Sequence, residues 1–108
     1  MTKFDVWYMR PEFFRDGTMG LKWLTERQLL PRTGDLAATH VKVRSVEADN
    51  LEAVFAGMQG EVWSPNGEAR GLIRSLGLQH TSMSVGDIAT DETGAAHIVD
   101  RFGFAVLL

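Results

Sequence analysis

The residues closest to a catalytic pattern lie in one short stretch, where a histidine precedes two serines and an aspartate: His80, Ser82, Ser84 and Asp87. A serine nucleophile needs a base within hydrogen-bond reach, and that base needs a third group to orient it. Spacing along a loop establishes neither contact. The same residues suit a turn in which Asp87 accepts backbone N–H groups, the serines bond nearby backbone and Gly86 takes a positive φ. We therefore predict a structural turn here and no catalytic residue.

Metal binding is the second chemistry that these residue types allow, because the chain has three histidines although it has no cysteine. His40, His80 and His97 fall in three separate expected elements, and no two of them are spaced four residues apart. A metal site needs ligands that converge on one point, with deprotonated partners. The sequence therefore predicts no metal site, and no motif in it requires a cofactor.

A tryptophan followed by two arginines marks the first candidate surface for a partner. Trp63 precedes an expected helix, where Asn66 and the first-turn N–H groups could receive an anion or a carboxylate. Arg70 and Arg74 lie one turn apart on one face of that helix. Because tryptophan and arginine are favoured interface anchors, we predict that these four residues bind a protein partner. The structural alternative is that Trp63 packs back on the helix and the arginines are solvated.

A cationic strand is the second candidate surface. Alternation over residues 39–46 points His40, Lys42 and Arg44 to one side, away from Val41 and Val43. A half-buried strand with a solvated face explains this pattern, and the functional interpretation is contact with nucleic acid or an acidic protein. The formal net charge of −3 disfavours nucleic acid, because the chain as a whole does not attract a phosphate backbone.

Two glycines near the C-terminal end mark expected breaks in the strands. Gly94 is expected in the left-handed position of a turn over residues 91–94. Gly103 lies between Phe102 and Phe104, which could stack bases as in single-strand binders, but only Arg101 supplies an adjacent cation. We expect instead a bulged strand end whose phenylalanines fill the core.

Length and composition predict one domain over residues 1–108, because 44% of the 108 residues are hydrophobic. The absence of cysteine fits a reducing compartment. The first residues contain no apolar run of signal-peptide length, and no apolar stretch approaches the ~20 residues that span a bilayer. We therefore expect a cytoplasmic protein without a membrane segment.

Strands at both ends of the chain, with helices between them, must position these residues. Alternation predicts strands at 4–9, 39–46, 88–90, 96–100 and 104–107. A helical pattern over 11–30 is broken at Asp16-Gly17, and Thr18 is expected to cap its second piece. Two further helices are expected, from Asp49, which begins a capping-box spacing, to Gly57 or Gly60, and from Ser64-Pro65 to Leu76. The order β-α-α-β-α-α-β-β-β predicts an α+β fold, with a mostly antiparallel sheet and helices on one face.

Two segments near the C-terminal end carry a resemblance to a known family. Ser82-Met-Ser-Val-Gly-Asp-Ile88 followed by Val99-Asp-Arg-Phe-Gly-Phe104 resembles the end of the YodL-like family, which are small domains encoded on plasmids and conjugative elements. The helix Asp49-Asn-Leu-Glu-Ala-Val-Phe55 resembles the family's Leu-Glu-Asp-Ile-Tyr-type helix. Met83 replaces the usual leucine, Arg101 replaces a common serine, and the expected helix at 64–76 replaces a short His-Pro-containing stretch. The resemblance covers about the C-terminal half, implies an accessory protein of a mobile element, and brings no catalytic residues.

These observations together predict a non-enzymatic interaction module of a mobile genetic element that binds a host or transfer-machinery protein. Inhibition of a host defence system is the version that analogy favours. The alternative is a nucleic-acid-binding accessory protein, whose affinity would fall steeply with salt and which would use His40, Lys42, Arg44, Arg70 and Arg74. A third hypothesis, a small enzyme built on the His80–Asp87 stretch, is weaker because the turn explains the same residues.

Overall fold

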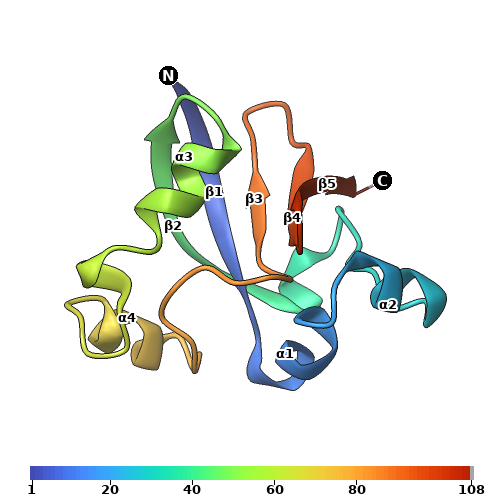
Figure 1. The fold of residues 1–108 in the computed structure, drawn as a ribbon, viewed down its shortest axis with the longest axis horizontal. Coiled ribbons are helices and arrows are strands. Elements are labelled where there is room, and N and C mark those ends of the chain that lie inside the picture. The colour runs from blue at the N-terminus through green and yellow to red at the C-terminus, as the bar shows by residue number, and fades with distance from the viewer. Residues whose placement is uncertain (108) are drawn as a thin grey trace.

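Five strands form one antiparallel sheet in the computed structural model, which describes residues 1–107 (Figure 1). Their spatial order is β2-β1-β3-β4-β5. The bounds are Thr2–Met9 for β1, His40–Ala48 for β2, Ile88–Thr90 for β3, Ala96–Asp100 for β4 and Gly103–Leu107 for β5. β1 pairs with both β2 and β3, so the first strand of the chain joins its two halves. The predicted α+β class and element order are confirmed.

Short helices connect the strands of the described chain. They are α1 (Pro11–Gly17), α2 (Leu21–Glu26), the 3-10 turn η1 (Leu36–Ala38), α3 (Leu51–Gly57), the 3-10 turn η2 (Glu61–Trp63) and α4 (Arg70–Ser75). Two predicted caps are wrong by one or two residues. Gly20, not Thr18, precedes α2, and the Thr18 hydroxyl donates to the Arg15 carbonyl. Asn50, not Asp49, caps α3 by accepting the Ala53 N–H at 2.8 Å.

The predicted helix over 64–76 begins six residues late, at Arg70. The segment before it folds back on η2: the Ala69 N–H donates to the Val62 carbonyl at 2.9 Å. Gly67 allows this close approach, because a Cβ there would lie 2.0 Å from the Glu61 carbonyl oxygen. The Ser64 hydroxyl also donates to that Glu61 carbonyl, at 2.9 Å, and so caps no helix. A serine and proline pair that is typical of a helix start therefore closes a turn here.

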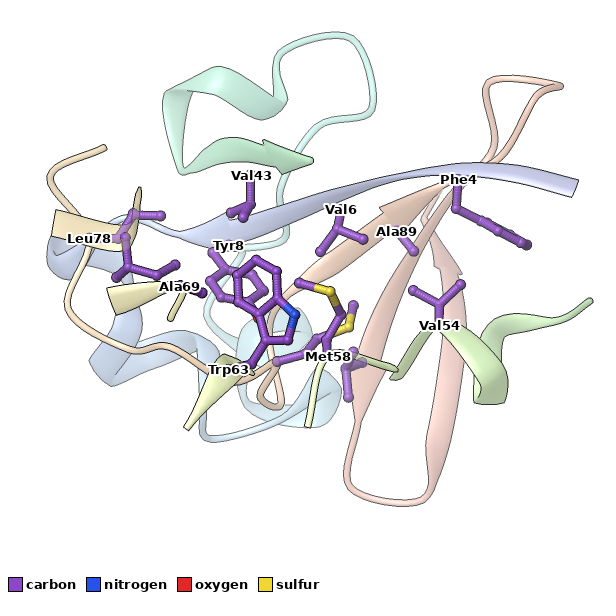
Figure 2. Packing of buried hydrophobic residues seen from close by; sticks show 13 residues of the cluster. Phe4, Val6, Tyr8, Val43, Val54, Met58, Trp63, Ala69, Leu78 and Ala89 are labelled. Carbon is purple, nitrogen blue, oxygen red and sulfur yellow. The ribbon is translucent and has the colours of Figure 1, made fainter. Parts of the chain in front are cut away.

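Helices cover both faces of the sheet, whereas the sequence predicted one covered face. On one side, Val6 and Tyr8 of β1 belong to a core cluster that α3 and α4 complete (Figure 2). On the other side, Trp7 packs on a second cluster with Leu24 of α2 and Leu36 of η1. The second layer is required because β1 carries large apolar side chains on both faces, and a strand of that kind must be covered twice.

A β-bulge divides the residues that were expected to form the cationic strand face. The register of β1 with β2 pairs Trp7 with Lys42 but Val6 with Arg44, so Val43 is an additional residue on β2. Side chains alternate along a strand, so Lys42 lies on the face of Trp7 and Arg44 on the face of Val6. The prediction of a single cationic face is therefore wrong, because one inserted residue reverses the alternation.

Candidate functional site

Asp87 is the centre of the turn that the sequence predicted between residues 82 and 87. Its side chain is fully buried. One carboxylate oxygen accepts the Met9 N–H of β1 at 2.8 Å, and the other accepts the Ser84 N–H at 2.8 Å. The Ser84 hydroxyl donates to the Ser82 carbonyl at 3.2 Å. The turn thus shows the backbone contacts expected of these residues, and it also fastens the end of β1 to the C-terminal half of the chain.

Gly86 allows this turn to pack against the N-terminal half. It has a φ of 98°, as predicted, in the region where a side chain is strained. A Cβ at this position would lie 2.5 Å from the Met9 sulfur and 2.7 Å from the Gly17 carbonyl oxygen. Both the backbone conformation and the close approach therefore require glycine.

His80 makes the most direct side-chain contact with Asp87. Its Nε2 lies 2.8 Å and 3.0 Å from the two carboxylate oxygens. The imidazole stacks on Tyr8 with ring centroids 4.7 Å apart, and Phe14 packs on it at 4.9 Å. The Tyr8 hydroxyl donates to the Thr81 carbonyl at 2.9 Å. Because an ionised carboxylate only accepts hydrogen bonds, Nε2 carries the proton in this contact.

Burial sets the protonation behaviour of the groups around this pair. It raises the pKa of Asp87 above its ordinary value, and the contacts with His80 and with backbone N–H groups oppose that shift. Burial also raises the pKa of Tyr8 well above its usual range, and the nearby charge of Asp87 adds to the effect. Tyr8 is therefore a neutral hydrogen-bond donor at any physiological pH.

An open groove of about 530 Å³ lies beside this pair, between α4 and the segment 78–82. Its lining residues are Pro65, Asn66, Arg70, Ile73, Arg74, Leu78, Gln79, His80, Thr81 and Ser82. Three of the four predicted partner-binding residues, Asn66, Arg70 and Arg74, thus share one depression with His80 and Ser82. The lining contains two arginines and no carboxylate. Neither arginine forms an ion pair within residues 1–107. A protein with a net charge of −3 therefore has a locally cationic groove.

Trp63 is the predicted partner-binding residue that the structure removes from the surface. Only 4% of it is exposed. Its ring packs beside Tyr8 (Figure 2), edge-on with centroids 6.3 Å apart. The Arg44 guanidinium lies 5.7 Å from the Trp63 ring centroid. The prediction of an exposed anchor is wrong, and the alternative of inward packing is what the structure shows. The predicted anion contact at the first helical turn is also wrong, because α4 begins at Arg70, beyond Asn66.

The predicted nucleic-acid surface is dispersed. His40 is fully buried, and burial lowers its pKa to about 4, so its ring is neutral. Its Nε2 donates to the Gly86 carbonyl at 2.8 Å, because a carbonyl only accepts. Lys42 lies 3.5 Å from the Asp5 carboxylate, and Arg44 lies on the opposite face of the sheet. His40 is therefore excluded from contact with a ligand, and the other two cations cannot act together.

Gly94 has the positive φ that its predicted turn requires, whereas the bulge expected at Gly103 is wrong, because β4 and β5 pair in an unbroken register. Gly94 has a φ of 88° and Gly103 a φ of 111°. Gly103 pairs with Asp100 across a two-residue loop between β4 and β5. Phe102 in that loop is completely exposed, so the expectation that it fills the core is wrong. Phe104 does pack inward.

His80 is the groove residue that the sequence did not assign to a binding surface. The sequence suggests it only as a base for a serine or as a metal ligand, whereas the structure places it in the same groove lining as Arg70 and Arg74. No spacing rule connects residue 80 with residues 70 and 74, because their proximity depends on how α4 docks against the following segment. Ser82 was predicted as a turn residue and also lines the groove.

Within residues 1–107, no group of three potential ligands is placed to hold a metal ion, and no helix is long and apolar enough to cross a bilayer. No protein-family model, curated protein or solved structure matches the chain. The resemblance to the YodL-like family therefore stays a prediction that rests on the quoted segments.

Proposed function

We propose that the protein is a non-enzymatic binding module whose groove beside α4 receives an acidic segment of a protein partner. The observation that carries this proposal is the unpaired cationic lining of the groove. Arg70 and Arg74 lie one helical turn apart with Asn66 nearby, and no carboxylate lines the same depression. A guanidinium binds a carboxylate through two parallel hydrogen bonds, which gives both affinity and orientation.

The groove also has an apolar base, which suits a peptide better than a free ion. Ile73 and Leu78 line it and are almost fully buried themselves. A protein interface typically combines such an apolar centre with arginine at its edge. An acidic segment with one apolar side chain between its carboxylates fits this arrangement.

The biological setting is proposed on other grounds. The resemblance of residues 82–88 and 99–104 to the YodL-like family supports an accessory role on a mobile genetic element, with a host or transfer-machinery protein as the partner. Inhibition of a host defence system rests on analogy alone. Nucleic acid is the competing partner, and it loses support because its predicted residues do not form one surface.

Affinity capture from a bacterial lysate with matched charge variants tests the proposal. The tagged protein is compared with R70E/R74E and with R15E/R32E, a control in which two exposed arginines outside the groove are reversed. Captures are run with and without nuclease at two salt concentrations. The acidic segment of any captured protein is then synthesised, and its affinity for each variant is measured.

We expect a stoichiometric protein that survives nuclease and is captured by the wild type and R15E/R32E but not by R70E/R74E. Equal capture by all three variants would show that the groove is not the binding site. Captured material that is lost on nuclease treatment and at the higher salt concentration would identify nucleic acid, and not a protein, as the partner.

A further inference from the structure

His80 lines the groove, and its Nδ1 has no hydrogen-bond partner in the described chain. Nε2 of the same ring is committed to Asp87. Every buried side-chain nitrogen or oxygen in residues 1–107 has a partner, so Nδ1 is not sealed in the core. His80 lines the groove, and Nδ1 is the ring nitrogen that no residue of 1–107 occupies.

The ring is fixed in this orientation. Tyr8 stacks on one side of it at an interplanar angle of 20°, and Phe14 packs on it at 53°. Asp87 holds its Nε2 with a carboxylate that two backbone N–H groups orient in turn. A side chain held by three neighbours does not have to be ordered when a ligand binds, so little conformational entropy is lost.

The hydrogen-bonding role of Nδ1 depends on protonation. In the neutral ring, with the proton on Nε2, Nδ1 is an acceptor and does not attract an anion. In the protonated ring it becomes an N–H donor, and the Asp87 carboxylate contacts the other nitrogen of the positively charged ring. A histidine oriented by a carboxylate can therefore bind an oxyanion only after it takes up a proton.

We propose that His80 completes an oxyanion site in this groove, donating from Nδ1 to a carboxylate or phosphate oxygen that Arg70 and Arg74 also hold. This inference rests on the proposed function, because it concerns the same groove. It adds a specificity residue, the chemical class of the recognised group, and a proton that is bound together with the ligand. Ser82 lines the same groove.

The other ionisable groups around His80, apart from Asp87, do not change their charge near neutral pH. β1 contributes Tyr8, whose pKa is raised above its usual range, and β2 contributes His40, whose pKa is lowered to about 4. α4 contributes Arg70 and Arg74, and Arg10 lies close enough to His40 to affect it. Arginines stay charged throughout this range. Asp87 contacts Nε2 of His80 directly, so the charge of this carboxylate is coupled to that of the ring.

Binding should therefore strengthen as the pH falls. A bound oxyanion favours the protonated ring, so complex formation takes up a proton. For one proton the affinity can rise by at most about tenfold for each pH unit. We expect the dissociation constant to fall several-fold or more between pH 8 and pH 6.

NMR titration of the full chain with two probes measures this effect. The probes are a blocked hexaglutamate peptide, for carboxylate, and inorganic sulfate, for a phosphate-like group; both keep their charge between pH 6 and pH 8. H80Q keeps an amide donor toward Asp87 but lacks Nδ1. H97Q is the matched control, because His97 forms a similar pair with Asp91 at 3.0 Å outside the groove.

We expect the wild type and H97Q to bind at least one probe several-fold more tightly at pH 6 than at pH 8. H80Q should bind it more weakly and equally at both pH values. Binding of the peptide alone identifies carboxylate as the recognised group, and binding of sulfate alone identifies a phosphate-like group. The ring ¹⁵N shifts of His80 at pH 7 provide a second readout: Nδ1 should become protonated when the probe is added.

The outcomes separate the two proposals. Binding that R70E/R74E abolishes, but that neither pH nor H80Q changes, would overturn the role of His80 and leave the proposed function standing. No binding of either probe to the wild type at both pH values would overturn both. If H80Q does not fold, an unchanged Nδ1 shift on probe addition is sufficient to reject the inference.

Discussion

Two histidine–aspartate pairs in this molecule have nearly the same contacts and different surroundings. The Nε2–Oδ2 distance is 2.8 Å between His80 and Asp87, and 3.0 Å between His97 and Asp91. Each aspartate also accepts two backbone N–H groups. The Asp87 side chain is 0% exposed and that of Asp91 is 21% exposed. Burial raises the pKa of Asp87, whereas hydrogen bonds from Thr93 and then His97 lower that of Asp91 to about 2.

The difference lies in what each aspartate connects. Asp91 accepts hydrogen bonds from within its own hairpin, from residues at most six positions away. Asp87 accepts one from Met9, 78 positions away in the sequence. The same pair of side chains is therefore a local cap in one place and a link between the two halves of the protein in the other. The contribution of each pair to the free energy of unfolding depends on which neighbouring groups would lose a hydrogen-bond partner without the aspartate.

Substitution of the two aspartates by alanine should give the largest difference. D87A leaves two backbone N–H groups and His80 without an acceptor in a buried place, and we expect a loss of ~3–5 kcal/mol in the free energy of unfolding. D91A removes the contacts of an exposed turn, and we expect a loss of ~1 kcal/mol. Urea denaturation measures both. Equal losses would contradict the role of Asp87 as the link between the halves.

Alanine substitution of the glycines near the two aspartates tests the same difference in packing, with a smaller expected loss of stability. Gly86 and Gly94 have φ values of 98° and 88°, so alanine is strained at both, by ~1–2 kcal/mol. A Cβ at Gly94 meets no atom within 4 Å, whereas one at Gly86 meets Met9 and Gly17. We therefore expect G94A to lose only the conformational term and G86A to lose roughly 3 kcal/mol in total. Thermal unfolding should separate the two variants, and a similar midpoint would show that the packing at Gly86 can relax.

The features of this fold that depend on residues close in sequence could be predicted. Glycines at turns, a helical stripe along α3 and alternation in β1, β3 and β4 are signals that neighbouring residues determine. The bulge at Val43 was not accessible, because nothing in the alternation of β2 marks an inserted residue. His40 was misjudged for a different reason: it shares a face with Lys42 as the pattern indicates, but it is buried because α1 and the turn at Gly86 pack against it.

Only parts of the candidate site could be predicted from the sequence. The sequence identified Arg70 and Arg74 as a pair, and it identified the turn at Asp87 with its backbone contacts. It did not place His80 between them, because that contact depends on α4 docking beside the segment 78–82. Trp63 was assigned to the surface because tryptophan is a favoured interface anchor, whereas here its side chain packs in the core against Tyr8.

The acid dependence of stability should have opposite signs at the two aspartates. The native pKa of Asp91 is lowered to about 2 from the unfolded value of about 3.9, so its contribution to stability is present above pH 4 and is lost as the pH falls toward 2. The native pKa of Asp87 is raised, so its contribution is fully present below about pH 3.9 and decreases as the pH rises through the native value. Urea denaturation of the wild type, D91N and D87N between pH 2 and pH 6 measures both slopes. The stability advantage of the wild type over D91N should shrink with acid, and its advantage over D87N should grow. If both differences change in the same direction, burial is not what distinguishes the two pairs.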